Sequence, residues 1–294
     1  MKRNRPWVER IVDRLWVEIT PWLEDKEPVP EKGESGGSVS GTMSWPGACR
    51  ALAIDKTWSS RGFRRRRAVR EVVETLAPVD GRFFATWLKT HGPHWLDDPR
   101  VRAAAEWGDP MKAPAILLGT SHPWSPSSLR YLAHAVWLMK EGYVQRGGRV
   151  IEIGVGFGGL AAMLALVADA RVTLIDLPEV VAAAQSCMKD LGLDHHLLEA
   201  RTAGREDLVV SNYAFTELSV ALQDSYIEEV LRFSGRGVIL SNAEVFSRGI
   251  GGRDNRALMA ALSAAGIPVR EWADAEIIAP SDRLCRNTLL AWKS

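Results

Sequence analysis

The chain has 294 residues, of which 46% are hydrophobic, so it is long enough for one large globular domain or two ordinary ones. Its 37 Lys and Arg residues nearly cancel 36 Asp and Glu residues, and a net charge of +1 excludes no class but favours neither nucleic acid nor membranes as partners. Three widely spaced cysteines fit neither a disulfide framework nor a zinc site. No run reaches the roughly 18 apolar residues of a membrane span, and no signal peptide is visible, so we expect a cytoplasmic protein.

The first 145 residues are predicted to form a mainly helical domain. Ten of the twelve tryptophans lie in this half. Apolar residues recur there at intervals of three and four, within Val8–Leu15, Val69–Leu76 and Leu129–Trp137. Residues 28–47 are rich in Pro, Gly and Ser, which predicts a flexible loop.

Residues 146–294 are predicted to form a separate α/β domain, because short apolar runs alternate there with helical segments. Seven strands are expected, over Arg149–Ile153, Arg171–Asp176, His196–Ala200, Asp207–Asn212, Gly237–Asn242, Val269–Ala273 and Thr288–Trp292. The helices between them are expected over Gly158–Val167, Pro178–Leu191, Leu222–Phe233 and Asn255–Ala265. This order is typical of a parallel sheet wound with helices.

A glycine-rich turn, Gly154–Gly159, follows the first of these strands and leads into a helix, so the backbone can turn tightly and approach a ligand closely. The glycines alone do not choose a cofactor, because the dinucleotide spacing is also satisfied by Gly154, Gly156 and Gly159. Glu152, near the end of the strand, favours a cofactor that carries an ammonium group at its nearby end, since it would repel a pyrophosphate. The helix N-terminus can receive a carboxylate of the same cofactor.

A carboxylate also ends the second predicted strand. Asp176 lies about 20 residues past the glycines, where an acid can bind both hydroxyl groups of a ribose. Alternatively, Asp176 only begins the next helix, because Asp followed by Leu177 and Pro178 is a common helix start. The two interpretations are compatible in part, and the ribose role is favoured.

Two further strand ends carry the same pair of polar residues, Ser211-Asn212 and Ser241-Asn242. The carboxyl ends of the strands are where open α/β sheets hold ligands. Ser and Asn also terminate strands and start turns without any other role. A ligand role is therefore favoured for Asn212 only.

Together these segments resemble the bacterial sugar O-methyltransferases, on Glu152–Gly159, Ile175–Glu179 and Ser211–Leu218, with Gln223 and Tyr226 following. The resemblance covers roughly the C-terminal half. It implies a class I methyltransferase (Rossmann-like) seven-stranded sheet, with S-adenosyl-L-methionine as methyl donor and S-adenosyl-L-homocysteine as product. It also implies a small hydroxylated, sugar-like acceptor in a polysaccharide or natural-product pathway. The expected cofactor-binding residues are Glu152, Gly154, Gly156, Gly158, Asp176, Leu177 and Asn212.

An alcohol acceptor must be aligned with the methyl group and must lose a proton. The candidate catalytic residues are His122, in a loop rich in Gly, Pro and Ser, and Glu217, after the fourth strand. A surface histidine and a helix-capping glutamate are the plainer interpretations. The candidate substrate-binding residues are Tyr213, Asn242 and His91. Because Asn212 stands where a metal-ligating Asp would be expected, no metal is predicted.

Several alternatives stay open. The arginine-rich run Arg61–Arg70 either binds phosphate or, as we favour, forms a solvated helix face. The acceptor atom can be nitrogen or carbon instead of oxygen, and an amine would need no strong base. A nicotinamide-dependent oxidoreductase would share the glycine spacing, although Glu152 counts against it. The chain can also be a non-catalytic scaffold with a methyltransferase fold, and a homodimer is one assembly that the sequence allows.

Overall fold

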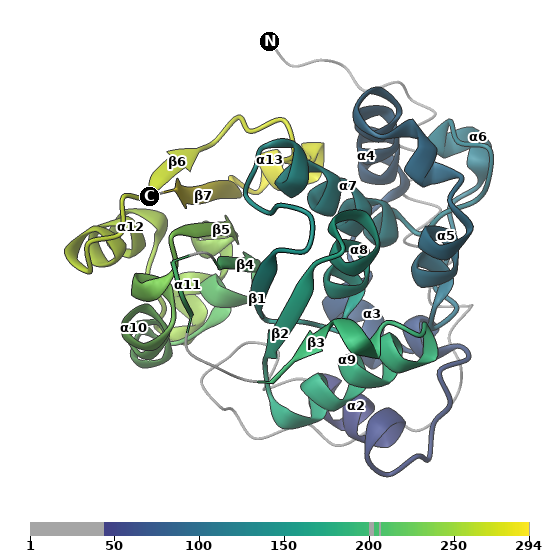
Figure 1. The fold of residues 1–294 in the computed structure, drawn as a ribbon, viewed down its shortest axis with the longest axis horizontal. Helices are drawn as coiled ribbons and strands as arrows, with labels where there is room; N and C mark the ends of the chain where they lie inside the picture. Colours follow the sequence, from purple (N-terminus) through teal and green to yellow (C-terminus); the bar gives the residue numbers. More distant parts are fainter. Residues whose placement is uncertain (1–43, 200–202, 206, 294) are drawn as a thin grey trace.

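The computed structural model describes residues 44–199, 203–205 and 207–293, and these form a central sheet with helices on both faces (Figure 1). The strand order is β3-β2-β1-β4-β5-β7-β6. The strands are β1 (Arg149–Ile153), β2 (Arg171–Ile175), β3 (Leu197–Leu198), β4 (Leu208–Asn212), β5 (Arg236–Ser241), β6 (Arg270–Trp272) and β7 (Thr288–Lys293).

Strands β1 to β5 pair in parallel, and β7 is inserted antiparallel between β5 and β6. A dinucleotide-binding sheet of the order 3-2-1-4-5-6 lacks this inserted strand. The topology is that of the class I methyltransferase fold, so the predicted seven-stranded sheet is confirmed. The third strand is shorter than predicted, and Ala200, its predicted last residue, lies outside the described residues.

Helices α7 (Pro126–Lys140), α8 (Gly159–Ala168) and α9 (Pro178–Asp190) pack on one face of the sheet (Figure 1). The other face is covered by α10 (Val220–Glu229) and α12 (Asn255–Ala264). The predicted helices of this half are thus confirmed, while α11 (Ala243–Ile250) and the short α13 (Pro280–Leu284) were not predicted. Both helices are short, and neither carries the long apolar repeat from which the other helices were predicted.

The N-terminal half is helical as predicted, with α2 (Trp45–Ala53), α3 (Arg67–Val73), α4 (Pro78–His91), α5 (Pro99–Glu106) and α6 (Ala115–Leu118). The predicted helix over Val8–Leu15 lies outside the described residues, and so does the predicted loop up to residue 43. The loop prediction is wrong for residues 45–47, which begin α2. Pro46 suits the first turn of a helix, and Trp45 is buried in the core at 2% exposure.

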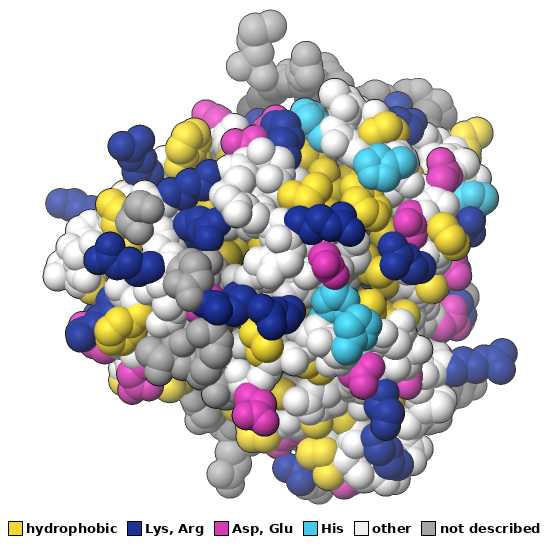
Figure 2. Space-filling model, in the orientation of Figure 1, with side chains coloured by type: hydrophobic (Ala, Val, Ile, Leu, Met, Phe, Trp, Pro, Cys, Tyr) yellow, Lys and Arg dark blue, Asp and Glu magenta, His cyan; other side chains and the backbone are white. Residues whose placement is uncertain are grey.

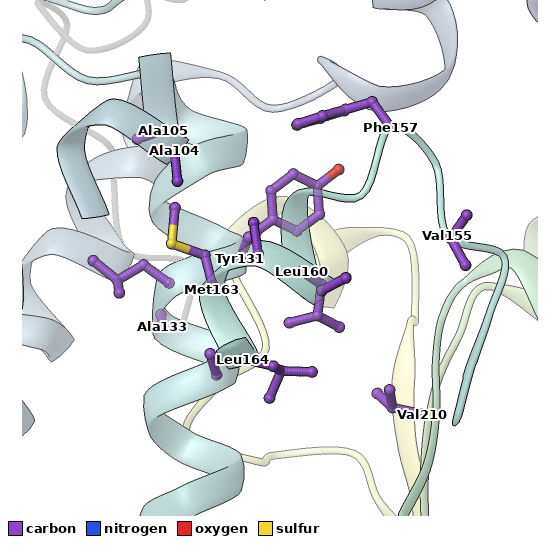
Figure 3. Close-up of a cluster of buried hydrophobic side chains, with 14 of the residues drawn as sticks. Ala104, Ala105, Tyr131, Ala133, Val155, Phe157, Leu160, Met163, Leu164 and Val210 are labelled. Atoms are coloured by element: carbon purple, nitrogen blue, oxygen red, sulfur yellow. The ribbon is translucent and has the colours of Figure 1, made fainter. Parts of the chain in front are cut away.

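The two halves share one apolar core. Tyr131 and Ala133 of α7 pack against Leu160, Met163 and other residues of α8, as Figure 3 shows. The same cluster of buried residues contains side chains from α2 to α9 and from the sheet. The apolar core is continuous across residue 145. The predicted division into two domains at that position stays a prediction.

The surface is of mixed character. On the face shown in Figure 2, Lys and Arg side chains are spread among acidic and hydrophobic ones, in keeping with the net charge of +1. Within the part of the chain that the structure describes, no helix is both long and apolar enough to cross a membrane.

Candidate functional site

The register of the sheet brings three of the predicted site residues to one edge. Leu174, Glu152 and Val210 are neighbours across β2, β1 and β4. Because side chains alternate between the faces of a strand, the residues two positions further along point to the same side. Asp176, Gly154 and Asn212 therefore follow this row at the carboxyl edge, on the face covered by α7 and α8.

Glu152 is the most unusual of these residues. Its side chain is 2% exposed, and its Oε2 atom has no hydrogen-bond partner among the described residues. Burial, together with the nearby Asp176 carboxylate, raises the pKa of the Glu152 carboxyl well above its ordinary value. A backbone hydrogen bond from Ala161 opposes the shift but leaves Oε2 unpartnered. A buried carboxylate oxygen without a partner is costly, and an ammonium group beside it would remove the cost.

Asp176 ties the second strand to the glycine turn. The backbone N–H of Val155 donates to its Oδ2 at 2.9 Å, and the N–H of Leu177 donates to its Oδ1 at 2.8 Å. Burial outweighs these bonds and raises the pKa of the carboxyl to about 6. Leu177 is the N-cap of α9, so Asp176 lies one residue before the N-cap and two residues before Pro178, the first residue of the helix. Each carboxylate oxygen accepts more than one hydrogen bond, so both can still bind a diol.

The glycines of the turn are required by the backbone. Gly154, Gly156 and Gly158 all have positive φ, at 79°, 54° and 90°. A Cβ at Gly154 would lie 1.9 Å from the Cβ of Ala214, in the segment after β4. The turn therefore packs directly against the loop that follows Asn212, which explains part of the glycine pattern without a ligand.

Asn212 ends β4, and its Nδ2 is buried without a hydrogen-bond partner within the described ranges. The next residue, Tyr213, has a positive φ of 71°, which is uncommon for a residue with a side chain and is typical of functional turns. The Tyr213 hydroxyl donates to Asp282 of α13 at 3.0 Å. The predicted ligand residues Asn212 and Tyr213 thus lie together, facing α7 and α13.

Glu217 and Asn242 lie together on the far side of the same edge. The Asn242 amide donates to the Glu217 carboxylate at 2.6 Å and accepts from the Thr216 hydroxyl at 2.6 Å. Burial raises the pKa of the Glu217 carboxyl, although the bond from Asn242 opposes the shift. A carboxyl with a raised pKa is a better proton acceptor near neutral pH than an exposed one.

The two predicted histidines lie elsewhere. His122 is 40% exposed, and its nearest charged neighbour is Asp97, at 4.0 Å from Nε2. His91 stacks on Trp87 with ring centroids 4.3 Å apart and lines a groove along α4. Among the described residues, no hydrogen bond, ion pair or ring contact joins either histidine to Glu152, Asp176 or Asn212. Their predicted roles stay predictions that the geometry does not support.

Sequence reasoning missed two residues of α7 that lie at this site. Arg130 and His134 are 6% and 4% exposed, one helical turn apart on a helix that is buried from Pro126 to Leu138. His134 lies beside the amide of Asn212, and neither of its ring nitrogens has a hydrogen bond within the described part of the chain. The sequence signal was two ionisable residues four apart inside an apolar helix, and an exposed helix face has the same spacing.

The N-terminal helices cover the turn. A Cβ at Gly156 would approach Val73 of α3 to 3.3 Å. Cys49 of α2 is fully buried, and burial and the nearby carboxylates of Asp176 and Glu179 raise the pKa of its thiol. Helices α2 and α3 therefore belong to the site as well as to the core.

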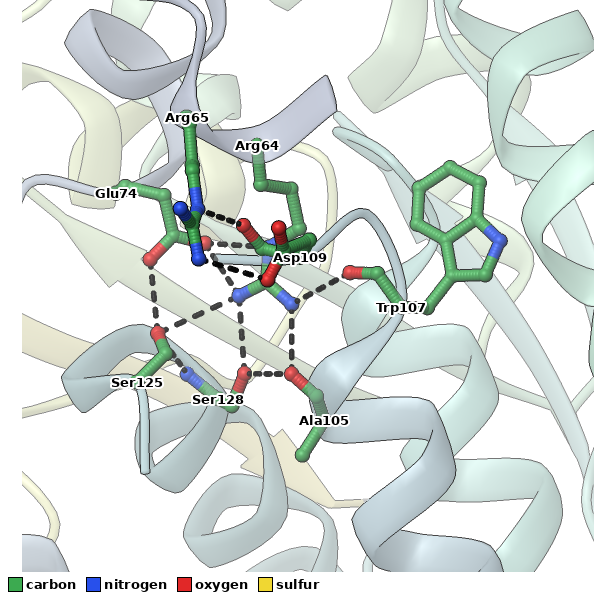
Figure 4. A network of polar contacts seen from close by, with 8 residues as sticks. All are labelled: Arg64, Arg65, Glu74, Ala105, Trp107, Asp109, Ser125 and Ser128. Carbon is green, nitrogen blue, oxygen red and sulfur yellow. Dashed lines mark hydrogen bonds and ion pairs between the residues drawn. The ribbon is translucent and has the colours of Figure 1, made fainter. Parts of the chain in front are cut away.

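Arg64 lies at the centre of a polar network in the N-terminal half, as Figure 4 shows. It is fully buried and donates to Glu74 at 2.6 Å, and the rest of its guanidinium binds Ala105, Trp107, Ser125 and Ser128. Its guanidinium also lies 4.3 Å above the ring of Phe157, the large side chain of the glycine turn. The expectation of a solvated arginine run is thus wrong for Arg64, and also for the buried Arg66, which stacks on Trp58.

Within residues 44–199, 203–205 and 207–293, no three His, Cys, Asp or Glu side chains are grouped so as to hold a metal ion. The predicted absence of a metal stays a prediction.

No protein-family model and no curated protein matches the sequence. Among solved structures, phosphoethanolamine N-methyltransferase 2 of Haemonchus contortus, in complex with S-adenosyl-L-methionine, is similar at 16% identity and a TM-score of 0.40, over 48% of this chain and 38% of that one. An S-adenosylmethionine-dependent methyltransferase from Aquifex aeolicus is 20% identical, with a TM-score of 0.41 over 56% and 91% of the two chains. The cyclase SpnF is 15% identical, with a TM-score of 0.44 over 69% and 94%. The chain thus spans less than half of the first of these proteins.

Proposed function

We propose that the chain is an S-adenosyl-L-methionine-dependent methyltransferase that methylates a hydroxyl group of a small, sugar-like acceptor. The observation that carries the first part is the buried, unpartnered Oε2 of Glu152 at the glycine turn, one strand away from Asp176. An ammonium group and a ribose diol are the groups that these two carboxylates suit. A fold alone does not fix an activity, so the proposal depends on these side chains.

Glu152 would hold the ammonium group of the cofactor, Asp176 its ribose, and Gly154–Gly158 its carboxylate end. Bound there, the cofactor supplies an electrophilic methyl group on a sulfonium. The chain's own residues then have two tasks, which are to align the acceptor and to take up its proton. Glu217 is our candidate proton acceptor, because burial raises its pKa and Asn242 fixes its orientation.

Equilibrium binding tests the cofactor directly. Titration calorimetry is expected to detect S-adenosyl-L-homocysteine binding and no binding of NAD(H) or NADP(H). Binding of the nicotinamide cofactors instead would reject the proposal. Methyl transfer is then assayed with polyols, amines and activated carbon acids through the release of S-adenosyl-L-homocysteine. The acceptor that is methylated shows whether the reacting atom is oxygen, nitrogen or carbon, and cofactor binding without any transfer points to a scaffold.

The affinity for S-adenosyl-L-homocysteine is expected to depend on pH through Asp176. Ribose hydroxyls donate to the ionised carboxylate, whose pKa is about 6 in the free protein. Binding therefore favours the ionised form of Asp176, so the contribution of this residue to the affinity should be constant well above pH 6 and fall by up to about tenfold per unit below it. Glu152, whose pKa is also raised in the free protein, adds a separate pH dependence that remains in an Asp176 variant. Calorimetry from pH 5 to 8 measures this fall in affinity. The Asp176→Asn variant should bind S-adenosyl-L-homocysteine weakly at every pH and should lose this fall in affinity below pH 6. An unchanged fall in that variant would exclude ribose binding by Asp176.

A further inference from the structure

Arg130 of α7 carries a buried charge that the described chain leaves unpaired. Its side chain is 6% exposed, its Nε has no hydrogen-bond partner, and no carboxylate lies within ion-pair distance of it among the described residues. Its guanidinium lies 5.3 Å from the ring centroid of Tyr131 and 5.2 Å from that of Tyr213. These aromatic contacts offer a cation partial compensation at most.

The other buried guanidinium of this region, Arg64, shows how the fold normally pairs such a group. Arg64 has an ion pair with Glu74 and hydrogen bonds to two carbonyl oxygens and two hydroxyls. Both arginines lie in the same core, yet only one is satisfied. A guanidinium cannot release its proton to escape burial, so only a partner can remove the cost.

The nearest acid to Arg130 is already engaged. Asp282 of α13 accepts a hydrogen bond from the Tyr213 hydroxyl at 3.0 Å and another from the Asn287 amide at 2.9 Å. Asp80, behind α13, accepts the backbone N–H of Ser281 at 3.1 Å. These bonds fix α13 over the site. Burial lowers the pKa of the Arg130 guanidinium, and the neighbouring tyrosines and the charge of Asp282, which acts from beyond ion-pair distance, raise it, but Arg130 and Asp282 form no ion pair.

Arg130 lies beside the residues that end β4. Tyr213, under its guanidinium, directly follows Asn212, whose unpartnered amide faces His134 one turn along α7. Burial and the charge of Arg130 lower the pKa of His134 to about 3, so its imidazole is neutral and can accept a hydrogen bond at physiological pH. One cation, the neutral imidazole of His134 and the Asn212 amide beside it thus lie together at the end of β4.

We propose that Arg130 binds an anionic group of the methyl acceptor, a carboxylate or a phosphate, and so selects acidic acceptors at this edge of the sheet. This inference rests on the proposed function, since it names the class of the acceptor. The planar fork of five N–H donors matches both anions, and the buried setting strengthens such bonds. Asn212 and His134 bind polar groups of the same acceptor.

The test uses inorganic phosphate and acetate as probes on the whole chain, with sodium chloride at equal ionic strength as reference. Phosphate or acetate is expected to raise the Tm of the wild-type protein by about 2 °C or more. Arg130→Met should lose this rise, with a Kd for the anion that is at least about tenfold weaker. Arg130→Lys, which keeps the charge but not the fork, should retain part of it. The anion with the larger effect identifies the group.

The matched control is Arg64→Met, which removes a paired guanidinium of the same core. That variant should show a lower Tm but the same rise with phosphate or acetate. The proposal is overturned if neither anion affects the wild-type protein, if both act equally on Arg130→Met, or if Arg130→Met loses as much Tm without anion as Arg64→Met does. Titration with S-adenosyl-L-homocysteine is read separately, so failure of the methyltransferase assignment and failure of the anion site are distinguishable.

Discussion

Replacement of Arg64 by methionine is expected to lower the free energy of unfolding by about 3–5 kcal/mol. The substitution leaves the carboxylate of Glu74, which is 7% exposed, without its cation. It also removes the Arg64 Nη1 donor that the carbonyls of Ala105 and Trp107 share, although Ala105 keeps the bond from the Ser128 hydroxyl. Methionine fills much of the same volume, so the loss measures the polar network and not a cavity. Urea denaturation followed by far-ultraviolet circular dichroism gives the value.

Arg67→Met, in the same arginine-rich run, is the control. Arg67 is 63% exposed and pairs with Glu71 one helical turn away, an arrangement that contributes about 0.3–0.5 kcal/mol. Similar losses in the two variants would mean that the Arg64 network does not stabilise the fold.

Replacement of Glu152 by glutamine is expected to weaken S-adenosyl-L-homocysteine binding by about 10- to 100-fold, because a charge-assisted hydrogen bond becomes a neutral one. The same substitution should not destabilise the free protein. The pKa of Glu152 is raised in the folded state, so the native carboxyl opposes folding increasingly as the pH rises above the unfolded-state value. Glutamine removes that cost, and its Tm advantage should grow from pH 5 to pH 8. Calorimetry and thermal unfolding measure the two effects.

Glu229→Gln, an exposed position at the end of α10, controls for the lost charge and should change neither quantity. A Glu152→Gln variant that binds S-adenosyl-L-homocysteine as tightly as the wild type would remove the main support for the cofactor assignment. A marked loss of Tm would instead show that the carboxyl has a structural partner.

The sheet could be predicted from the sequence because its determinants are local. Apolar runs bounded by Gly, Asp and Asn predicted β1, β2, β4 and β5 to within one or two residues. The glycine turn was visible for the same reason, since positive φ at Gly154, Gly156 and Gly158 is a property of the backbone itself. The cofactor side of the site therefore follows from short segments.

The proposed acceptor side could not be predicted in this way, because it depends on long-range packing. Arg130 and His134 have the spacing of an ordinary helix face, and only the burial of α7 on all sides makes them unusual. In the sequence, Arg64 is one arginine among several. Its hydrogen bond to Ser128 joins residues 64 positions apart, so the sequence pattern could not indicate that Arg64 is buried. His122 and His91 were chosen for their residue type, yet their contacts lie on other parts of the surface.

The side chain of Phe157 extends from the glycine turn and packs among side chains of the N-terminal half. It stacks on Trp107 with ring centroids 5.8 Å apart, meets Tyr131 edge-on at 5.7 Å and lies under Arg64. Any motion of the turn must therefore displace side chains of the helices around it. Occupancy of the turn should slow amide hydrogen exchange in α3 and α7 together with β1, so that a signal read far from the ligand reports its binding.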